Sequence, residues 1–177
     1  MQSVAVNSAT VLLVVMYIRA VAIFNLWCIL CLQNDPQSAY EVLPNVREGL
    51  ETLKSRGLHL GVVSNFDSSL TPTLRAHGLD GYFDFTVTSE DAGAAKPEPA
   101  IFHKALHEFD IGLLSPRDVA HVGDELENDY FAPRSVGMTA FLVDREGQLS
   151  SAVMQKVVDQ RHVVRDLKDV GELVLPH

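Results

Sequence analysis

Apolar and polar positions divide the chain into two regions. Residues 11–32 form an apolar run that only three residues interrupt: Tyr17, Arg19 and Asn25. From Asp35 onward, short apolar segments alternate with amphipathic ones, after a linker-like Asp-Pro-Gln-Ser sequence at residues 35–38. The pattern therefore predicts an apolar N-terminal segment over residues 1–34 and one folded domain over residues 35–177.

The apolar run admits three interpretations. Its length suits a membrane helix, which takes roughly 20 apolar residues, although a central Arg19 would cost about 2.5–3.5 kcal/mol. A strand that is buried on both faces of a parallel sheet has the same composition. The third interpretation is a segment that does not fold stably. A cleaved signal peptide is not indicated, because the sequence lacks a basic leading region and a small-residue cleavage site.

The folded region alternates between helical and strand-like patterns. Apolar residues at helical spacing, with glycine stops and one proline start, predict helices over residues 46–56, 70–77, 100–109 and 127–136, another after residue 150, and a closing helix from Asp166. Short apolar runs predict strands over residues 58–63, 83–87, 119–122, 140–143 and 163–164. This alternation predicts an α/β fold class, a Rossmann-like parallel sheet flanked by helices.

The net negative charge of the chain argues against a nucleic-acid partner. Because the formal charge is −9 and the pI is near 5.1, no basic surface is available for a phosphate backbone, and a nucleic-acid partner is not expected. Arg19 is the only charged residue among residues 1–34. Residues 35–177 therefore hold 13 basic groups (14 − 1) and 23 acidic groups, a net charge of −10.

Two pairs of metal- or redox-capable residues have simpler explanations. Cys28 and Cys31 are the only cysteines, which excludes a disulfide framework and fits a reducing, intracellular compartment. Apolar residues surround both, so we interpret them as small apolar side chains. His103 and His107 lie four residues apart on a predicted helix, but no third zinc ligand accompanies them.

Polar residues gather where the predicted strands end. Ser64 and Asn65 follow one strand, Lys96 precedes a helix, and Asp124 and Asp129 follow another strand. Ligands of open parallel sheets bind at the carboxyl ends of the strands. A hydroxyl and a lysine suit a phosphate group, and paired carboxylates suit Mg²⁺, which prefers oxygen ligands. We therefore expect a phosphate site beside a magnesium site.

Three segments resemble known motifs. VVSNFD, AAKPEPAIF and HVGDELENDYFAPRSVGM are similar to motifs two, three and four of the haloacid dehalogenase (HAD) superfamily, in order and at ordinary spacing. The lead-in YEVLPNVREGLETLKSRGLHL is also typical of that family, and the Asn65-Phe66-Asp67 stretch most resembles its vertebrate HAD-like hydrolase domain-containing protein branch. The resemblance covers residues 40–144 of the 177.

The resemblance implies a Mg²⁺-dependent phosphatase that acts on a small phosphorylated molecule. Ser64 and the backbone of Asn65 would then bind the phosphoryl group, and Lys96 would neutralise charge on the nucleophile and the phosphate. Asp124 would be a magnesium ligand, with Asp129 supporting it.

The expected first motif, D-x-D-x-T/V, is missing. Its first aspartate attacks phosphorus in this family, and nothing like it precedes Ser64. The nearest candidate is the apolar segment 21–24, which would place Asn25 at the nucleophile and Trp27 at the acid/base position. A carboxamide is a poor nucleophile, so we expect a pseudoenzyme.

The resemblance also bears on the N-terminal region. Only 38 residues, positions 26–63, separate Asn25 from Ser64, too few for a helical cap domain. The first strand of the family fold is central, and without it the neighbouring strands would lose hydrogen-bond partners. We therefore favour a buried strand within residues 11–32 over a membrane anchor, in a truncated HAD-like core. A non-catalytic domain that binds phosphate or a partner protein is the main alternative to a phosphatase, and a membrane-anchored α/β domain is a further one.

Overall fold

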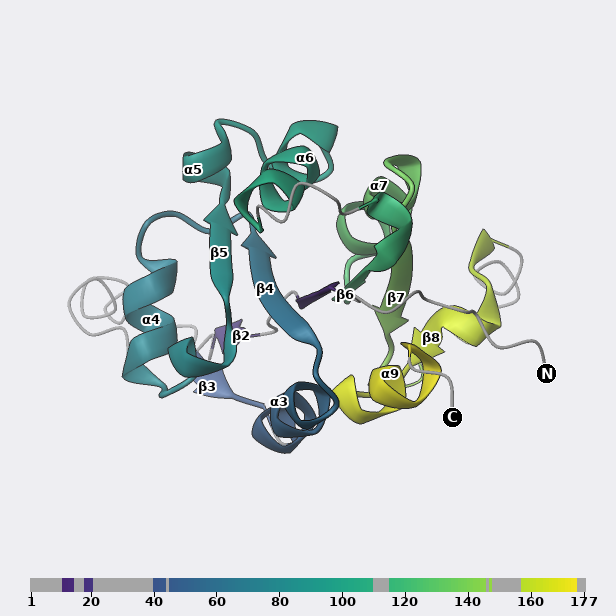
Figure 1. Ribbon diagram of the computed structural model, residues 1–177, viewed down its shortest axis with the longest axis horizontal. Helices are drawn as coiled ribbons and strands as arrows, with labels where there is room; N and C mark the ends of the chain where they lie inside the picture. Colours follow the sequence, from purple (N-terminus) through teal and green to yellow (C-terminus); the bar gives the residue numbers. More distant parts are fainter. Residues whose placement is uncertain are drawn as a thin grey trace, which may run out of the picture.

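A parallel sheet lies between two layers of helices in the computed structural model of the chain (Figure 1). The structure describes residues 11–14, 18–20, 40–43, 45–109, 115–145, 147 and 157–174. The linker-like residues 35–38 and the candidate Asn25, Trp27, Cys28 and Cys31 lie outside them.

Among the described residues, the main sheet has six strands, in the order β5-β4-β1-β6-β7-β8. Every neighbouring pair is parallel. The strands are β1 (Val11–Val14), β4 (His59–Ser64), β5 (Phe85–Thr88), β6 (Val119–Gly123), β7 (Thr139–Val143) and β8 (Val163–Val164). The predicted α/β class with a Rossmann-like parallel sheet is therefore confirmed.

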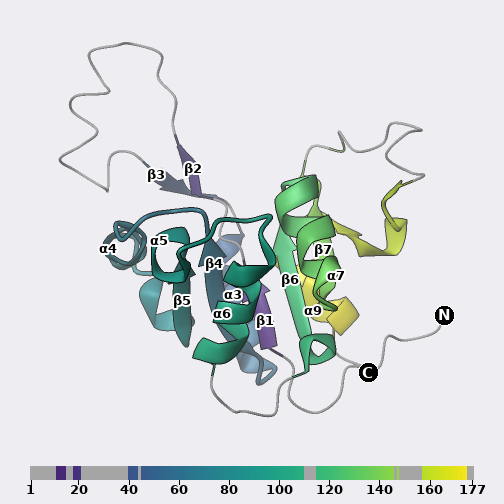
Figure 2. The ribbon, with the colours of Figure 1, turned by 90° about the horizontal axis from the view of Figure 1, so that it is seen from above.

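The apolar N-terminal segment contributes the central strand. β1 pairs with β4 on one side, Leu12 opposite Leu60, and with β6 on the other, Val14 opposite Val122 (Figure 2). The chain then forms β2 (Ile18–Ala20), which pairs antiparallel with β3 (Tyr40–Val42) in a separate two-stranded sheet. Because residues 11–14 and 18–20 are strands, the apolar run is not one continuous membrane helix. Within the described residues, no helix combines the length and apolarity needed to cross a membrane.

Helices cover both faces of the sheet. On one face lie α3 (Val46–Ser55), α4 (Leu70–Ala76) and α9 (Leu167–Val174). On the other lie α6 (Pro99–Glu108), the π-helix Leu126–Phe131 and α7 (Ala132–Ser135), with α5 (Ser89–Ala92) beside α6. Short 3₁₀ helices span Asp80–Tyr82, Pro116–Asp118 and Gln160–His162.

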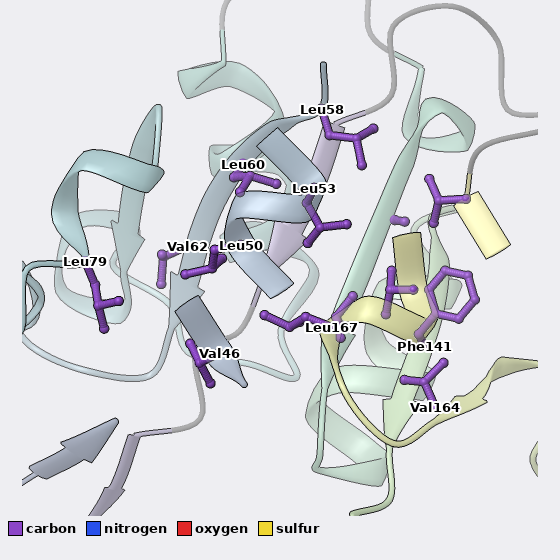
Figure 3. Packing of buried hydrophobic residues seen from close by; sticks show 14 of the residues in the cluster. Val46, Leu50, Leu53, Leu58, Leu60, Val62, Leu79, Phe141, Val164 and Leu167 are labelled. Atoms are coloured by element: carbon purple, nitrogen blue, oxygen red, sulfur yellow. The ribbon is translucent and has the colours of Figure 1, made fainter. Parts of the chain in front are cut away.

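Strand alternation divides the core between these two faces. Leu60 and Val62 of β4 pack with Leu50 and Leu53 of α3 (Figure 3). Val63, by contrast, packs on the face that α6 covers. Successive side chains of a strand point to opposite faces, so each buried strand needs apolar residues at consecutive positions. This explains the continuous runs that predicted the strands.

The predicted helix over residues 127–136 is only partly regular. Residues Leu126–Phe131 form a π-helix and Ala132–Ser135 an α-helix. Pro133 has no N–H to donate to the carbonyl of Asp129, four residues earlier, so the regular α-helical pattern cannot run through this point. The predicted strand over residues 83–87 begins later, at Phe85, because Asp84 accepts a hydrogen bond from the backbone N–H of Leu60.

Candidate functional site

The residues predicted to carry chemistry lie at one edge of the sheet. Ser64 is the half-buried last residue of β4, and Asp124 directly follows Gly123 at the end of β6. Since β1 lies between these two strands and all three are parallel, their carboxyl ends face the same side. Lys96 reaches this edge from the loop between α5 and α6.

Asn65 and Lys96 are joined through the main chain of the lysine. The backbone N–H of Lys96 donates to Asn65 Oδ1 at 2.6 Å, and Asn65 Nδ2 donates to the Lys96 carbonyl at 2.9 Å. One carboxamide therefore satisfies both backbone groups of the lysine. The Asn65 side chain fixes the loop before α6 against the end of β4, a contact that sequence analysis did not predict.

The ammonium group of Lys96 forms a buried ion pair. Lys96 Nζ lies 2.8 Å from Asp129 Oδ1, and the two side chains are 5% and 2% exposed. The same oxygen lies 3.1 Å from Nε2 of His121, which is fully buried on β6. The other oxygen, Oδ2, accepts the backbone N–H of Glu125 at 3.1 Å. Asp129 is thus enclosed by three hydrogen-bond donors.

The pKa values of Asp129 and His121 are shifted by this hydrogen-bond network. Burial alone would raise the pKa of Asp129, but the hydrogen bond from His121 and the positive charge of Lys96 outweigh it and lower the pKa to about 2. Burial lowers the pKa of His121, although the Asp129 carboxylate opposes it. Asp129 is therefore a charged carboxylate and His121 a neutral imidazole.

Gly123 makes room for this network. A Cβ at this position would lie 2.3 Å from Asp129 Cγ and 2.4 Å from its Oδ2, closer than real Cβ contacts come. The glycine at the end of β6 therefore allows Asp129 to approach the sheet.

A second group of contacts holds the loop that follows β4. The Ser89 hydroxyl donates to the carbonyl of Phe66 at 3.0 Å, and the backbone N–H of Ser68 donates to Glu90 Oε2 at 2.9 Å. Thr88 and Asp91 form a capping box at the start of α5. These contacts tie the segment after Ser64 to the neighbouring strand end.

The two carboxylates that are predicted to bind magnesium differ in their surroundings. Both oxygens of Asp129 already accept hydrogen bonds, which leaves Asp124 as the available carboxylate of the predicted pair. Burial, with the nearby charge of Asp129, raises the pKa of Asp124 to about 6. No cluster of three or more potential metal ligands occurs among the described residues. A magnesium site on Asp124 and Asp129 stays a prediction.

β1 is the strand that lies between β4 and β6 in the sheet. The central strand of the described sheet is Val11–Val14. The hypothesised segment 21–24 and Asn25 lie outside the described residues, so that assignment stays a prediction. In the sequence, Val15, Met16 and Tyr17 follow β1, and residues 1–34 contain no aspartate or glutamate. The segment that supplies the central strand therefore brings no carboxylate.

Sequence analysis missed His121. It lies in the apolar strand VAHVG, where a histidine looks like an interruption of the core pattern. The available signal was a buried polar residue in a strand that ends at Gly123-Asp124. Its partner, Asp129, lies eight residues later in the sequence. The two side chains are neighbours only because the π-helix brings Asp129 back against β6.

The fold and the buried lysine–aspartate pair define an α/β protein with a polar site at its strand ends, and the comparisons identify the family. The family model of haloacid dehalogenase-like hydrolases matches residues 23–137, more than half of the 177-residue chain. The chain belongs to the haloacid dehalogenase-like hydrolase family.

Relatives and solved structures agree with this assignment. Haloacid dehalogenase-like hydrolase domain-containing protein 3 of Bos taurus is 43% identical over 130 residues, 73% of this chain and 50% of that protein, which is consistent with the vertebrate branch. A phosphoglycolate phosphatase of Nitrosospira multiformis is 40% identical over 101 residues, 56% of this chain and 43% of that protein. A HAD phosphatase from Thermococcus onnurineus superposes with a TM-score of 0.69 at 29% identity, covering 81% of this chain and 62% of that chain.

The chain spans about half the length of the curated relatives it matches. Family membership and fold therefore describe this chain directly, whereas the activity of the longer relatives does not.

Proposed function

We propose that this chain binds a small phosphate-bearing molecule at the ends of β4 and β6 and does not hydrolyse it. The observation that carries the proposal is a contrast within one site. Lys96 is held by a buried network, while the segment that forms the central strand contains no carboxylate to act as nucleophile.

Binding of an anion is supported by the donors at the sheet edge. An ammonium group has three N–H donors, and one of them is used in the bond to Asp129. Ser64 is half-buried at the carboxyl end of β4. A lysine and a hydroxyl beside main-chain amides are suitable ligands for phosphate oxygens. A relative named as a phosphoglycolate phosphatase makes a small phosphorylated molecule the natural candidate ligand.

Loss of hydrolysis follows from the chemistry. A covalent route needs a nucleophile at the reacting phosphorus. Val15, Met16 and Tyr17, which follow β1 in the sequence, carry no carboxylate. Removing a catalytic nucleophile commonly costs several orders of magnitude in rate, about 1.4 kcal/mol for each tenfold. Ser64 and Lys96 therefore have binding roles in this proposal.

Binding is tested with inorganic phosphate. Titration followed by isothermal calorimetry and by amide chemical shifts should give saturable binding, with shifts concentrated at residues 64–66 and 94–96. Ser64→Ala should weaken binding. Ser55→Ala, at the exposed end of α3, should not. If phosphate produces no saturable shift, the proposal is wrong.

Hydrolysis is tested with p-nitrophenyl phosphate and Mg²⁺. We expect no release of nitrophenol above a matched blank. Release that Asp124→Ala abolishes would contradict the proposal and would instead support the magnesium-dependent phosphatase that the family suggests. A third outcome, release that Asp124→Ala leaves unchanged, would indicate a contaminating phosphatase and call for repurification before the measurement is repeated.

A further inference from the structure

We propose that His121 is a positioning residue that sets the location of the Lys96 ammonium group by fixing the Asp129 carboxylate. This inference rests on the proposed function, because it assigns a residue to the same anion site. It concerns a side chain inside the sheet that contributes no group to the site edge.

The geometry places two donors on one oxygen. His121 Nε2 lies 3.1 Å and Lys96 Nζ 2.8 Å from Asp129 Oδ1. The backbone N–H of Glu125 holds the other oxygen. With one donor from β6 and one from the turn after it, the carboxylate cannot rotate without breaking a hydrogen bond. The lysine therefore meets an acceptor whose position is already fixed.

The imidazole can act only as a donor here. An ionised carboxylate is an acceptor, so the bonded Nε2 must carry the proton. His121 Nδ1 is buried and has no hydrogen-bond partner among the described residues. The ring of Phe102 packs edge-on at 5.4 Å with an interplanar angle of 82°. The Nε2–H tautomer is thus assigned from the partners that the ring has.

Filling the core does not explain a histidine at this position. His121 is fully buried between Ala120 and Val122, and its partners across the sheet are Leu13 and Ala140. A polar ring is costly in such surroundings unless it forms a hydrogen bond. An aliphatic residue would fill the position without this cost, so the donated bond to Asp129 is the property that distinguishes histidine.

The test compares three substitutions that differ in donor position. The amide nitrogen of glutamine can occupy roughly the place of Nε2, that of asparagine the place of Nδ1, and leucine has no donor. His121→Gln should retain phosphate affinity within about twofold, because it restores the bond to Asp129. His121→Leu and His121→Asn should lose about tenfold or more, the value expected for a lost hydrogen bond to a charged group. His107→Gln, on the exposed side of α6, is the matched control.

Two spectroscopic measurements do not depend on phosphate binding. In ¹⁵N-histidine-labelled protein, the long-range ¹H–¹⁵N spectrum should show His121 as the Nε2–H tautomer. In ¹⁵N-lysine-labelled protein, the Nζ resonance of Lys96 should move in His121→Leu and return toward the wild-type position in His121→Gln. Circular dichroism establishes that each variant is folded.

The outcomes separate this inference from the proposed function. If wild-type protein does not bind phosphate but the two resonances behave as expected, the proposed function fails and the positioning role remains. An Nδ1–H tautomer, or a Lys96 resonance that responds equally to His121→Leu and His121→Gln, would overturn the role of His121 even if phosphate binds.

Discussion

Replacing Lys96 with methionine tests the buried ion pair most directly. Methionine keeps the apolar stem but removes the ammonium group, which leaves Asp129 with His121 and the backbone N–H of Glu125. The two paired side chains are 5% and 2% exposed, so water solvates the remaining Asp129 carboxylate poorly. Breaking such a buried pair by removing one partner typically costs about 3–5 kcal/mol.

Proton uptake limits this loss. Asp129 in the variant can become neutral instead of remaining charged and unpaired. At pH 7 protonation costs about 4 kcal/mol relative to an ordinary aspartate pKa near 3.9. We therefore expect Lys96→Met to lose about 3–4 kcal/mol of unfolding free energy at pH 7. The loss should shrink by up to about 1.4 kcal/mol for each pH unit on going from pH 7 to pH 5.

Urea unfolding followed by circular dichroism measures this difference at each pH. Lys104→Met is the matched control on the same side of the molecule, because its i,i+4 pair with Glu108 is 38% and 41% exposed and should contribute less than about 0.5 kcal/mol. Equal losses for the two variants, or a Lys96→Met loss that does not change with pH, would show that the ion pair does not stabilise the fold as reasoned.

Three further results follow from the site. Gly123→Ala should lower the unfolding free energy by about 3 kcal/mol or more in urea unfolding, because the new Cβ would lie 2.3 Å from Asp129 Cγ. Gly81→Ala, whose Cβ would have no atom within 4 Å, should change it by less than about 0.5 kcal/mol. Similar losses for the two variants would refute the predicted clash at Gly123. Asn65→Ala should cost about 1–2 kcal/mol in the same assay, since two hydrogen bonds to the loop before α6 are lost; an unchanged midpoint would argue against that tie. Sulfate should bind more tightly as the pH falls through about 6, and its own charge does not change between pH 5 and 7. Burial raises the pKa of Asp124 to about 6, so below that pH its carboxyl group is neutral and no longer repels the anion. Calorimetry should show that Asp124→Asn removes this pH dependence, and an unaltered dependence would exclude Asp124 as its source.

In the wild-type protein, the stabilising contribution of the Asp129 carboxylate should be lost only in acid. The folded-state pKa is lowered to about 2, below the unfolded value near 3.9. The stabilisation is therefore complete only above about pH 5 and is lost progressively as the pH falls through the folded-state pKa of about 2. In the Lys96→Met variant, the unfolding free energy should instead rise as the pH falls from 7 to 5. One pH series of urea titrations on the two proteins measures both pH dependences.

Much of the fold was predictable because its signals are local. The strands at residues 59–64 and 119–123 are continuous apolar runs, and the helix over residues 46–55 ends just before Gly57. Short-range patterns of this kind depend on burial and backbone preference, which neighbouring residues determine. The irregular turn at Leu126–Phe131 was harder, because it depends on Pro133 and on the return of Asp129 to the sheet.

The N-terminal segment shows where local pattern is insufficient. Residues 11–32 suit a membrane helix or a buried strand by composition alone. Pairing of β1 with β4 and β6 distinguishes the two, and these partners lie far along the chain. That pairing identifies Val11–Val14 as the central strand, while the hypothesised segment 21–24 lies outside the described residues.

By itself, the sequence determined the order of the elements, the acidic charge, the family motifs around Ser64, Lys96 and Asp124, and the lack of a carboxylate in residues 1–34. Only the tertiary structure decided which segment completes the sheet, that Asn65 binds the main chain of Lys96, and that His121 and Lys96 share one oxygen of Asp129. The reason is physical. Composition and periodicity report what a residue is and whether it is buried, whereas a hydrogen bond between distant segments depends on the positions that the folded backbone gives to both partners.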